Sequence, residues 1–273
     1  MSVPTSHDDF ECIRFERLDG DVLQVTIDRP GDDRNAELNA VDGRMHDELT
    51  HLFPVLKQER EARCIVLTGS GRAFSAGGDF DWFPTLQEPG RLEPLRQDGK
   101  NLIWDLLDVQ VPIVAAVNGH AMGLGASIAL LCDLIVVAES ARIGDPHVKV
   151  GVVAGDGGTV AWPLAIGPAL AKQYLLTGEP ISAAEAHRLG MVNEVAPDEE
   201  CLDRALVWAR KLAANAPMAV QYTKVAVNKL LKDAANTAFD VATALELLTF
   251  QSDDHAEALA AIRERRDPTF ENR

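Results

Sequence analysis

VNGHAMGLGAS, residues 117–127, is a glycine-rich turn that directly follows an apolar run typical of a buried strand. A second glycine turn, FSAGGDF at residues 74–80, also follows such a run. Neither turn is informative alone, but together they can aim two backbone N–H groups at one oxygen atom. Such a pair of donors stabilises a developing oxyanion without a metal ion or a charged side chain. The two turns therefore predict an enzyme.

The composition is that of a large folded domain rather than a disordered or fibrous chain. With 273 residues, of which 47% are hydrophobic and 25% charged, the chain can bury a sizeable core as one domain, or as one domain with an appendage. Its 42 acidic and 26 basic residues leave a formal charge of −16, which repels nucleic acids and anionic membranes. We therefore expect a small-molecule partner, no nucleic acid and no membrane, and a local basic pocket for any anionic ligand.

Cysteine usage and the N-terminus predict a cytoplasmic protein. The four cysteines are scattered, form no Cys-x-x-Cys pair and have mostly apolar neighbours, which favours buried, reduced thiols. No apolar run approaches the roughly 18 residues of a membrane span, and the N-terminus lacks the basic and apolar regions of a signal peptide.

Residues 1–196 predict an α/β core. Two alternating runs, Cys12–Leu18 and Val22–Asp28, meet at an Asp-Gly turn and predict an antiparallel hairpin. Strands and helices then alternate, which indicates a layered α/β arrangement. The expected order is a helix within residues 39–60, a strand at 64–67, a helix near 94–108, a strand at 112–117, a short helix to 131 and a strand at 134–138.

Residues 197–273 predict a helical tail. Ala-rich, helix-favouring sequence runs to Arg266, and expected breaks at 215–217, Asn236 and 252–254 divide it into three or four helices. The stretch Ala238–Phe250 is apolar on more than one face, so we expect it to cover another surface. That surface belongs either to a partner chain or to the same chain.

Two Gly-x-Gly segments after strands suggest dinucleotide binding, but neither completes the motif. Gly69-Ser-Gly71 and Gly123-Leu-Gly125 have Phe74 and Ile128, respectively, where the third glycine belongs. A nicotinamide or flavin cofactor is therefore not expected.

Ser127 resembles the nucleophile of an esterase elbow in the same incomplete way. Ala129 occupies the position that requires glycine, and the order Ser, His, Asp along the chain differs from the order in those hydrolases. We expect the Ser127 hydroxyl to mark the start of a helix rather than to form an acyl-enzyme.

One histidine follows a buried strand, where α/β sheets hold their ligands. His147 ends the segment Arg142–His147, and Asp156 stands nine residues later at the expected start of a helix. The positive end of that helix favours the carboxylate form of Asp156, which can orient a nearby imidazole and stabilise its charge. The pair is a candidate base for activating water or removing a proton. The alternative is that Asp156 only caps its helix.

The other histidines carry less information. His120 lies in the second glycine turn and has either a structural or a catalytic role. No spacing of His, Cys, Asp and Glu matches a dedicated zinc or iron site, so no metal is expected. Surface or packing roles account for the remaining histidines: His7, His46, His51, His187 and His255.

Together with the later segment GVVAGDGGT at 151–159, the two glycine turns resemble the crotonase (enoyl-CoA hydratase/isomerase) superfamily over nearly the whole chain. The resemblance implies a crotonase-like spiral of ββα units and a C-terminal helical region that builds homotrimers or dimers of trimers. It also implies acyl-CoA substrates of fatty acid metabolism, with coenzyme A present only as part of the substrate. Further similar segments are DRP at 28–30, NA at 39–40, PIVAAVNG at 112–119, CD at 132–133, LLTG at 175–178, GMVNE at 190–194 and PTF at 268–270.

By this resemblance, the backbone N–H groups of Gly78 and Leu124 would hold the oxyanion. Leu124 stands where the family commonly has glycine, a change that keeps the backbone donor but would narrow or redirect the acyl pocket. Substrate binding is expected around the early polar loop, residues 29–34, and in the two turns, at Arg29, Arg34, Ala36, Ala76, Gly77 and Gly123.

The catalytic residues depart from the family pattern. Hydratases of the family use two glutamates at the positions that Ser127 and His147 occupy here. The His147–Asp156 pair instead resembles the branch that cleaves carbon–carbon bonds in β-diketones by a retro-Claisen reaction, in which Glu246 would assist. Ser127, His120 and Glu246 are therefore further catalytic candidates. Three functions stay open: an acyl-CoA hydratase or isomerase with a His147 base, a carbon–carbon bond hydrolase, and a non-catalytic acyl-CoA-binding scaffold.

Overall fold

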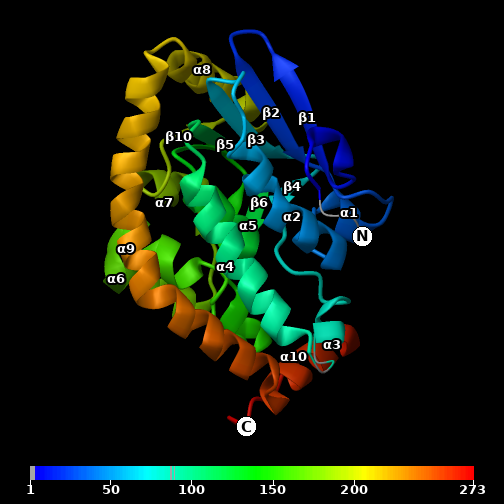
Figure 1. The fold of residues 1–273 in the computed structure, drawn as a ribbon. Helices are drawn as coiled ribbons and strands as arrows, with labels where there is room; N and C mark the ends of the chain where they lie inside the picture. Colours follow the sequence, from blue (N-terminus) through cyan, green and yellow to red (C-terminus); the bar gives the residue numbers. More distant parts are fainter. Residues whose placement is uncertain (1–3, 87, 89) are drawn as a thin grey trace.

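The larger of two sheets has six strands in the computed structural model, which describes residues 4–86, 88 and 90–273 (Figure 1). Its strand order is β1-β2-β3-β5-β7-β10, and every neighbouring pair is parallel except β1 and β2. That antiparallel pair is the predicted hairpin, and Gly20 and Asp21 in its turn have positive φ. The strands are β1 Ile13–Leu18, β2 Val22–Ile27, β3 Cys64–Gly69, β5 Ile113–Val117, β7 Leu134–Ala138 and β10 Glu194–Ala196.

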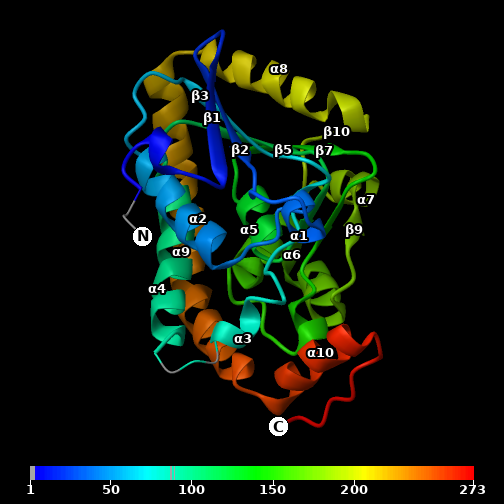
Figure 2. The ribbon, with the colours of Figure 1, turned by 90° about the vertical axis from the view of Figure 1, so that its right-hand side faces the viewer.

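The apolar runs that predicted strands lie in the middle of this sheet. Every residue of β3 and β5 is buried, which is typical of parallel strands covered on both faces. Helix α8, Cys201–Ala213, packs across β3, β5 and β7 and covers one face (Figure 2). The first helix of the tail is thus part of the wall of the α/β core.

A smaller sheet of four strands positions both glycine turns. Its order is β4-β6-β8-β9, and β4, β6 and β8 are parallel neighbours. The first glycine turn follows β4, and the second contains β6, so the pairing of these strands brings the turns together. The strands are β4 Ala73–Ser75, β6 His120–Met122, β8 Arg142–Gly144 and β9 Ile181–Ser182.

The helices form a layer beside the two sheets. Helix α4 packs between α2 and α9, and α6 packs against both α5 and α9 (Figures 1 and 2). The α-helices are α1 Arg34–Glu37, α2 Gly43–Leu56, α3 Phe83–Leu86, α4 Leu92–Asp108, α5 Leu124–Leu130, α6 Gly158–Thr177, α7 Ala183–Arg188, α8, α9 Pro217–Phe250 and α10 Asp253–Glu264. Short 3₁₀ turns are η1 His7–Asp9, η2 His147–Val150 and η3 Asp198–Glu200.

The expected break at Asn236 is wrong, because α9 runs without interruption for 34 residues. Ala235 and Phe239 on either side of Asn236 are fully buried, and α9 packs against α4 and α6. Asparagine is less favourable than alanine within a helix by less than about 1 kcal/mol. The free energy gained by burying the neighbouring apolar side chains is larger, so the helix continues through Asn236. The other two breaks are confirmed, and residues 197–273 contain the three helices α8, α9 and α10.

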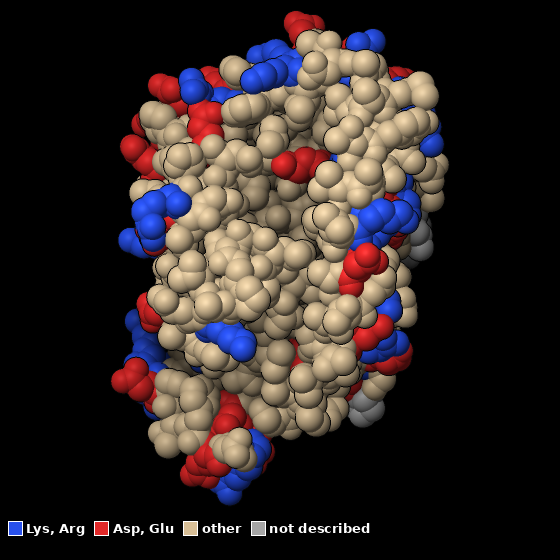
Figure 3. All heavy atoms as spheres, turned by 90° about the vertical axis from the view of Figure 1, so that its left-hand side faces the viewer, with Lys and Arg blue, Asp and Glu red and all other residues tan. Residues whose placement is uncertain are grey.

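The outward face of α9 remains apolar. Val241, Leu245 and Leu248 follow one another at helical spacing, and each is about half exposed or more. The side of the molecule on which α6 and α9 lie has few charged side chains at its centre, with most charges at its margins (Figure 3). Within the described residues, no helix combines the length and hydropathy needed to cross a membrane.

The contact between the two glycine turns depends on Gly77. Its φ is +79°, and an added Cβ would lie 2.8 Å from the Met122 carbonyl oxygen. We expect Gly77→Ala to lower the free energy of unfolding by about 1–3 kcal/mol, because it adds backbone strain and a clash. Urea unfolding measures the change. The control is Gly99→Ala within α4, where a Cβ meets no atom within 4 Å and should be neutral or stabilising. Equal unfolding midpoints for the two variants would contradict the role of Gly77.

Candidate active site

Three parallel strands of the smaller sheet end at the same edge, and the candidate residues follow them. Gly78 comes after β4, Leu124 after β6, and His147 after β8. Because the carboxyl ends of parallel strands lie side by side, segments far apart in the sequence meet here. A Cβ at Gly77 would contact the backbone at Gly123, and a Cβ at Gly123 would lie 3.2 Å from the His147 ring. Both turns and the imidazole are therefore packed together.

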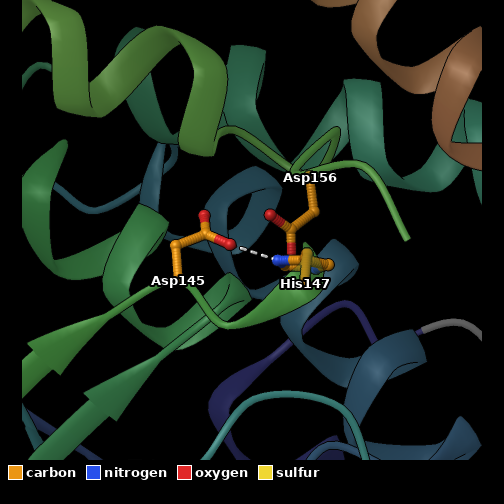
Figure 4. Close-up of side chains that lie close together, drawn as sticks. All are labelled: Asp145, His147 and Asp156. Atoms are coloured by element: carbon orange, nitrogen blue, oxygen red, sulfur yellow. Dashed lines mark hydrogen bonds and ion pairs between the residues drawn. The ribbon is translucent and has the colours of Figure 1, made fainter. Parts of the chain in front are cut away.

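Carboxyl groups approach both nitrogens of the His147 ring (Figure 4). Nδ1 is paired with Oδ1 of Asp145, which directly follows β8 and is buried. Nε2 lies 3.3 Å from Oδ2 of Asp156 and 3.9 Å from Oε1 of Glu246 on α9. The predicted neighbourhood of His147 and Asp156 is thus found, with Asp145 as a second partner.

The start of α6 explains the position of Asp156. Gly157, the residue before the helix, has φ +122° and turns the chain sharply into it. Asp156 precedes this turn and lies near the positive end of the helix dipole, which favours a negative charge. Its Oδ1 accepts a 3.4 Å hydrogen bond from the Ser127 hydroxyl, while Oδ2 faces His147. Ser127 thus holds Asp156, and its own side chain is fully buried.

The carboxyl groups hold His147 in its protonated form. Burial alone would lower the pKa of His147, but the charges of Asp145 and Asp156 outweigh it and raise that pKa well above 6.5. Burial, followed by repulsion from Asp156, raises the pKa of Glu246 well above its usual 4.5. These shifts favour an imidazolium at His147 and the protonated form of the Glu246 carboxyl.

His147 and its neighbours Asp156 and Glu246 line a cavity whose wall is mostly apolar. Gly78 and Leu124 both line this cavity, and their backbone N–H groups donate no hydrogen bond to any of the described residues. Leu124 is the first residue of α5, where helix N–H groups have no partner within the helix. The cavity is lined by Val41, His46, Gly78, Trp82, Phe83, Leu86, Leu95, Gly99, Leu124, His147, Asp156, Phe239, Thr243, Glu246, Leu247 and Phe250.

Some residues selected from the sequence lie outside this cavity. His120 is exposed, and its Nδ1 accepts a hydrogen bond from the Arg142 N–H. Arg29 donates to Asp79 at 2.7 Å and pairs with Asp42 at 3.3 Å, so its guanidinium is committed to internal carboxylates. Of the other predicted binding residues, Ala76, Gly77 and Gly123 lie within the two glycine turns, Ala36 is buried in α1 and Arg34 is exposed on α1; none of them is among the residues that line the cavity.

Two residues of the site were missed by sequence reasoning. Asp145 stands between β8 and His147. Its position directly after a strand was sufficient to indicate that it belongs to the site. His46 was assigned to surface or ordinary packing, yet its ring lines the cavity. Its spacing from Leu49 and Phe53 puts all three residues on the buried face of α2.

Among the described residues, Asp145, His147 and Asp156 form the strongest candidate site for a cation. One ligand atom from each of Asp145, His147 and Asp156 lies within 4.8 Å of the others. However, both ring nitrogens of His147 already face a carboxylate, and a metal ligand requires an unprotonated nitrogen. The arrangement fits proton transfer better than metal coordination.

Comparison with known proteins relates this fold and site to a family. The profile described as Enoyl-CoA hydratase/isomerase matches residues 17–273. The chain belongs to the enoyl-CoA hydratase/isomerase family. It is an enzyme of this family, and the crotonase fold expected from the sequence is confirmed.

Relatives of known name cover nearly the whole chain. A probable mitochondrial enoyl-CoA hydratase of Dictyostelium discoideum is 32% identical over 96% of this chain and 92% of its own length. An enoyl-CoA hydratase/isomerase structure from Mycobacterium paratuberculosis is 37% identical, with a TM-score of 0.85, over 95% of this chain and 99% of that one. A β-diketone hydrolase from the cyanobacterium Anabaena, bound to (S)-3-oxocyclohexyl acetic acid, is 32% identical, with a TM-score of 0.81, over 89% of this chain and 95% of that one.

Asp145→Asn tests the electrostatic role of the missed partner. The substitution removes a negative charge beside Nδ1 with little change of shape, so burial is opposed by fewer carboxylates and the pKa of His147 should fall. NMR titration of the His147 ring protons measures it. The control is Asp81→Asn at an exposed position. If His147 titrates in Asp145→Asn as it does in the wild type, Asp145 does not set its charge.

Proposed function

We propose that the protein acts on an acyl-CoA thioester through an enolate whose oxygen is held by the N–H groups of Gly78 and Leu124. The observation that carries this proposal is that both donors line the same cavity as the His147–Asp156 pair. Stabilising the carbonyl oxygen in this way makes the adjacent C–H bond more acidic. Membership of the enoyl-CoA hydratase/isomerase family supports the acyl-CoA class.

In this proposal, the His147–Asp156 pair is the base in place of the two glutamates of the hydratases. With the pKa of His147 raised, its Nε2 carries a proton directed at Asp156. The Asp156 carboxylate accepts the proton that leaves the substrate, and Nε2 of His147 supplies one to the product. One proton is taken and one is returned, so isomerisation needs no further reactant and hydration needs only water.

Glu246 can assist as an acid. Its carboxyl lies beside Nε2 of His147, and burial raises its pKa well above the usual value, which favours the protonated carboxyl. When neighbouring carboxyl groups differ in protonation, one can donate a proton while the other accepts one. Glu246 and Asp156 are suited to these two roles, and Glu246 can reload His147 after it has given up its proton.

Carbon–carbon bond cleavage in a β-diketone is the second candidate. It is favoured by the likeness to the Anabaena hydrolase and by the ion pairs that occupy Arg29, a residue expected to bind coenzyme A. In this reaction water loses a proton to Asp156 and attacks one carbonyl carbon. The bond from that carbon to its neighbour breaks, and Nε2 of His147 protonates the carbon of the leaving enolate.

His147→Ala tests the shared acid–base step in both reactions. We expect it to lower kcat/KM by about 10²–10⁴-fold, since a positioned acid–base group contributes that much. The assay uses a set of 2-enoyl-CoA and 3-oxoacyl-CoA thioesters together with a cyclic β-diketone, each followed by chromatography of the products. The matched control is His187→Ala, an exposed histidine on α7.

The same assay separates the two candidate reactions. Turnover of thioesters supports the acyl-CoA assignment, and binding is checked by calorimetry with acetoacetyl-CoA. Cleavage of the diketone alone, with no thioester binding at millimolar concentration, replaces it with carbon–carbon hydrolysis. Turnover in His147→Ala within a few-fold of the wild type would exclude an imidazole mechanism for either reaction.

We also propose that the apolar stripe of α9 joins copies of the chain in a trimer or a dimer of trimers. Leu248 is 64% exposed in the single chain, and Val241 and Leu245 continue the stripe. A charge at an exposed position should leave the fold intact but oppose burial between copies. Leu248→Glu is therefore expected to shift the mass measured by light scattering toward 29.6 kDa, with Lys229→Glu as the control. A wild-type protein that is already monomeric contradicts the proposal.

A further inference from the structure

His46 places a second imidazole in the cavity wall, on an element that contributes nothing to the group around His147. It comes from α2, and its side chain is largely buried, with 9% of the residue exposed. The ring nitrogens make no hydrogen bond to any described part of the protein. Neither nitrogen is among the buried polar atoms without a partner, so the ring remains open to the cavity rather than sealed in the core.

The His46 ring is neutral under physiological conditions. Burial lowers its pKa to about 4, against the opposing effect of Asp47 and Asp156. A neutral imidazole has one N–H donor and one nitrogen acceptor. His46 can therefore both donate to and accept from an uncharged oxygen group, which an imidazolium cannot do.

The surroundings of His46 are aromatic and aliphatic. The Trp82 ring lies 5.3 Å from the imidazole centroid, and Phe83 and Leu86 continue the wall. The Thr243 hydroxyl, another polar group of this cavity, is already used in bonds to the carbonyls of Gly155 and Phe239. Outside the His147 group, His46 is thus a side chain of this wall that can offer a ligand both a donor and an acceptor.

We propose that His46 selects substrates whose acyl part carries a hydroxyl or carbonyl oxygen in addition to the reacting carbonyl. This inference rests on the proposed function and specifies its substrate class. An oxygenated chain satisfies the imidazole, whereas a plain hydrocarbon chain displaces water from it and leaves it unpaired. Sites built to hydrogen-bond a substrate group discriminate strongly against analogues that lack the group.

The test compares two acyl-CoA thioesters of equal length, one of which carries an extra oxygen on the chain. We expect wild-type kcat/KM to favour the oxygenated thioester by at least about tenfold. His46→Leu, of similar size, should reduce this ratio to within about threefold of unity, whereas His46→Gln, which keeps a donor and an acceptor, should retain most of it. Thermal unfolding confirms that each variant is folded.

Three results would overturn the inference. They are a wild-type preference for the plain chain, an unchanged ratio in His46→Leu, and an equal loss of rate on both thioesters, which would make His46 an acid–base group instead. His147→Ala should slow both thioesters without changing their ratio. If the wild type turns over neither thioester, the proposed function fails, and the ratio of calorimetric Kd values for the same pair still tests His46.

Discussion

The pairing of both His147 nitrogens with carboxylates is the constraint on which the active site depends. The partners come from separate parts of the fold: Asp145 from the end of β8, Asp156 from the start of α6, and Glu246 from α9. The smaller sheet, the spiral core and the helical tail must all be docked before the imidazole has its final charge. The candidate site and the fold are therefore coupled in this chain, and Glu246 brings the helical tail into that site.

The electrostatic cost of this arrangement is limited by how the charges are distributed. Several ionised groups in an apolar cavity would be expensive unless they were paired. The raised pKa of His147 favours a positive charge that compensates the neighbouring carboxylates, and the raised pKa of Glu246 opposes a third negative charge. The Ser127 hydroxyl satisfies an Asp156 oxygen, but Oδ2 of Asp145 is buried without a described partner. That oxygen lies close to the first turn of α6, so the helix dipole is the remaining source of its stabilisation.

Local patterns predicted the elements well, and long-range packing accounts for most of the errors. Strand runs ending in glycine turns carry their own signal, so the hairpin, β3, β5 and β7 were predictable from the sequence. Asn236 was misread because the helix is stabilised by α4 and α6, which lie elsewhere in the sequence. His46 was missed for the same reason: helical spacing puts it on a buried face, but only the tertiary fold shows that this face borders a cavity rather than the core.

The two kinds of site component differ in what a substitution can change. The N–H groups of Gly78 and Leu124 belong to the backbone, and their positions follow from strand pairing and from the start of α5. A leucine in place of glycine at position 124 leaves such a donor intact. The proposed acid–base groups are side chains. Ser127 and His147 stand where hydratases of the family have glutamates, and this exchange changes which groups carry protons without altering the sheet. The two proposed components therefore differ in kind, because the backbone sets the N–H donors, whereas three carboxyl side chains around a single imidazole set the acid–base groups.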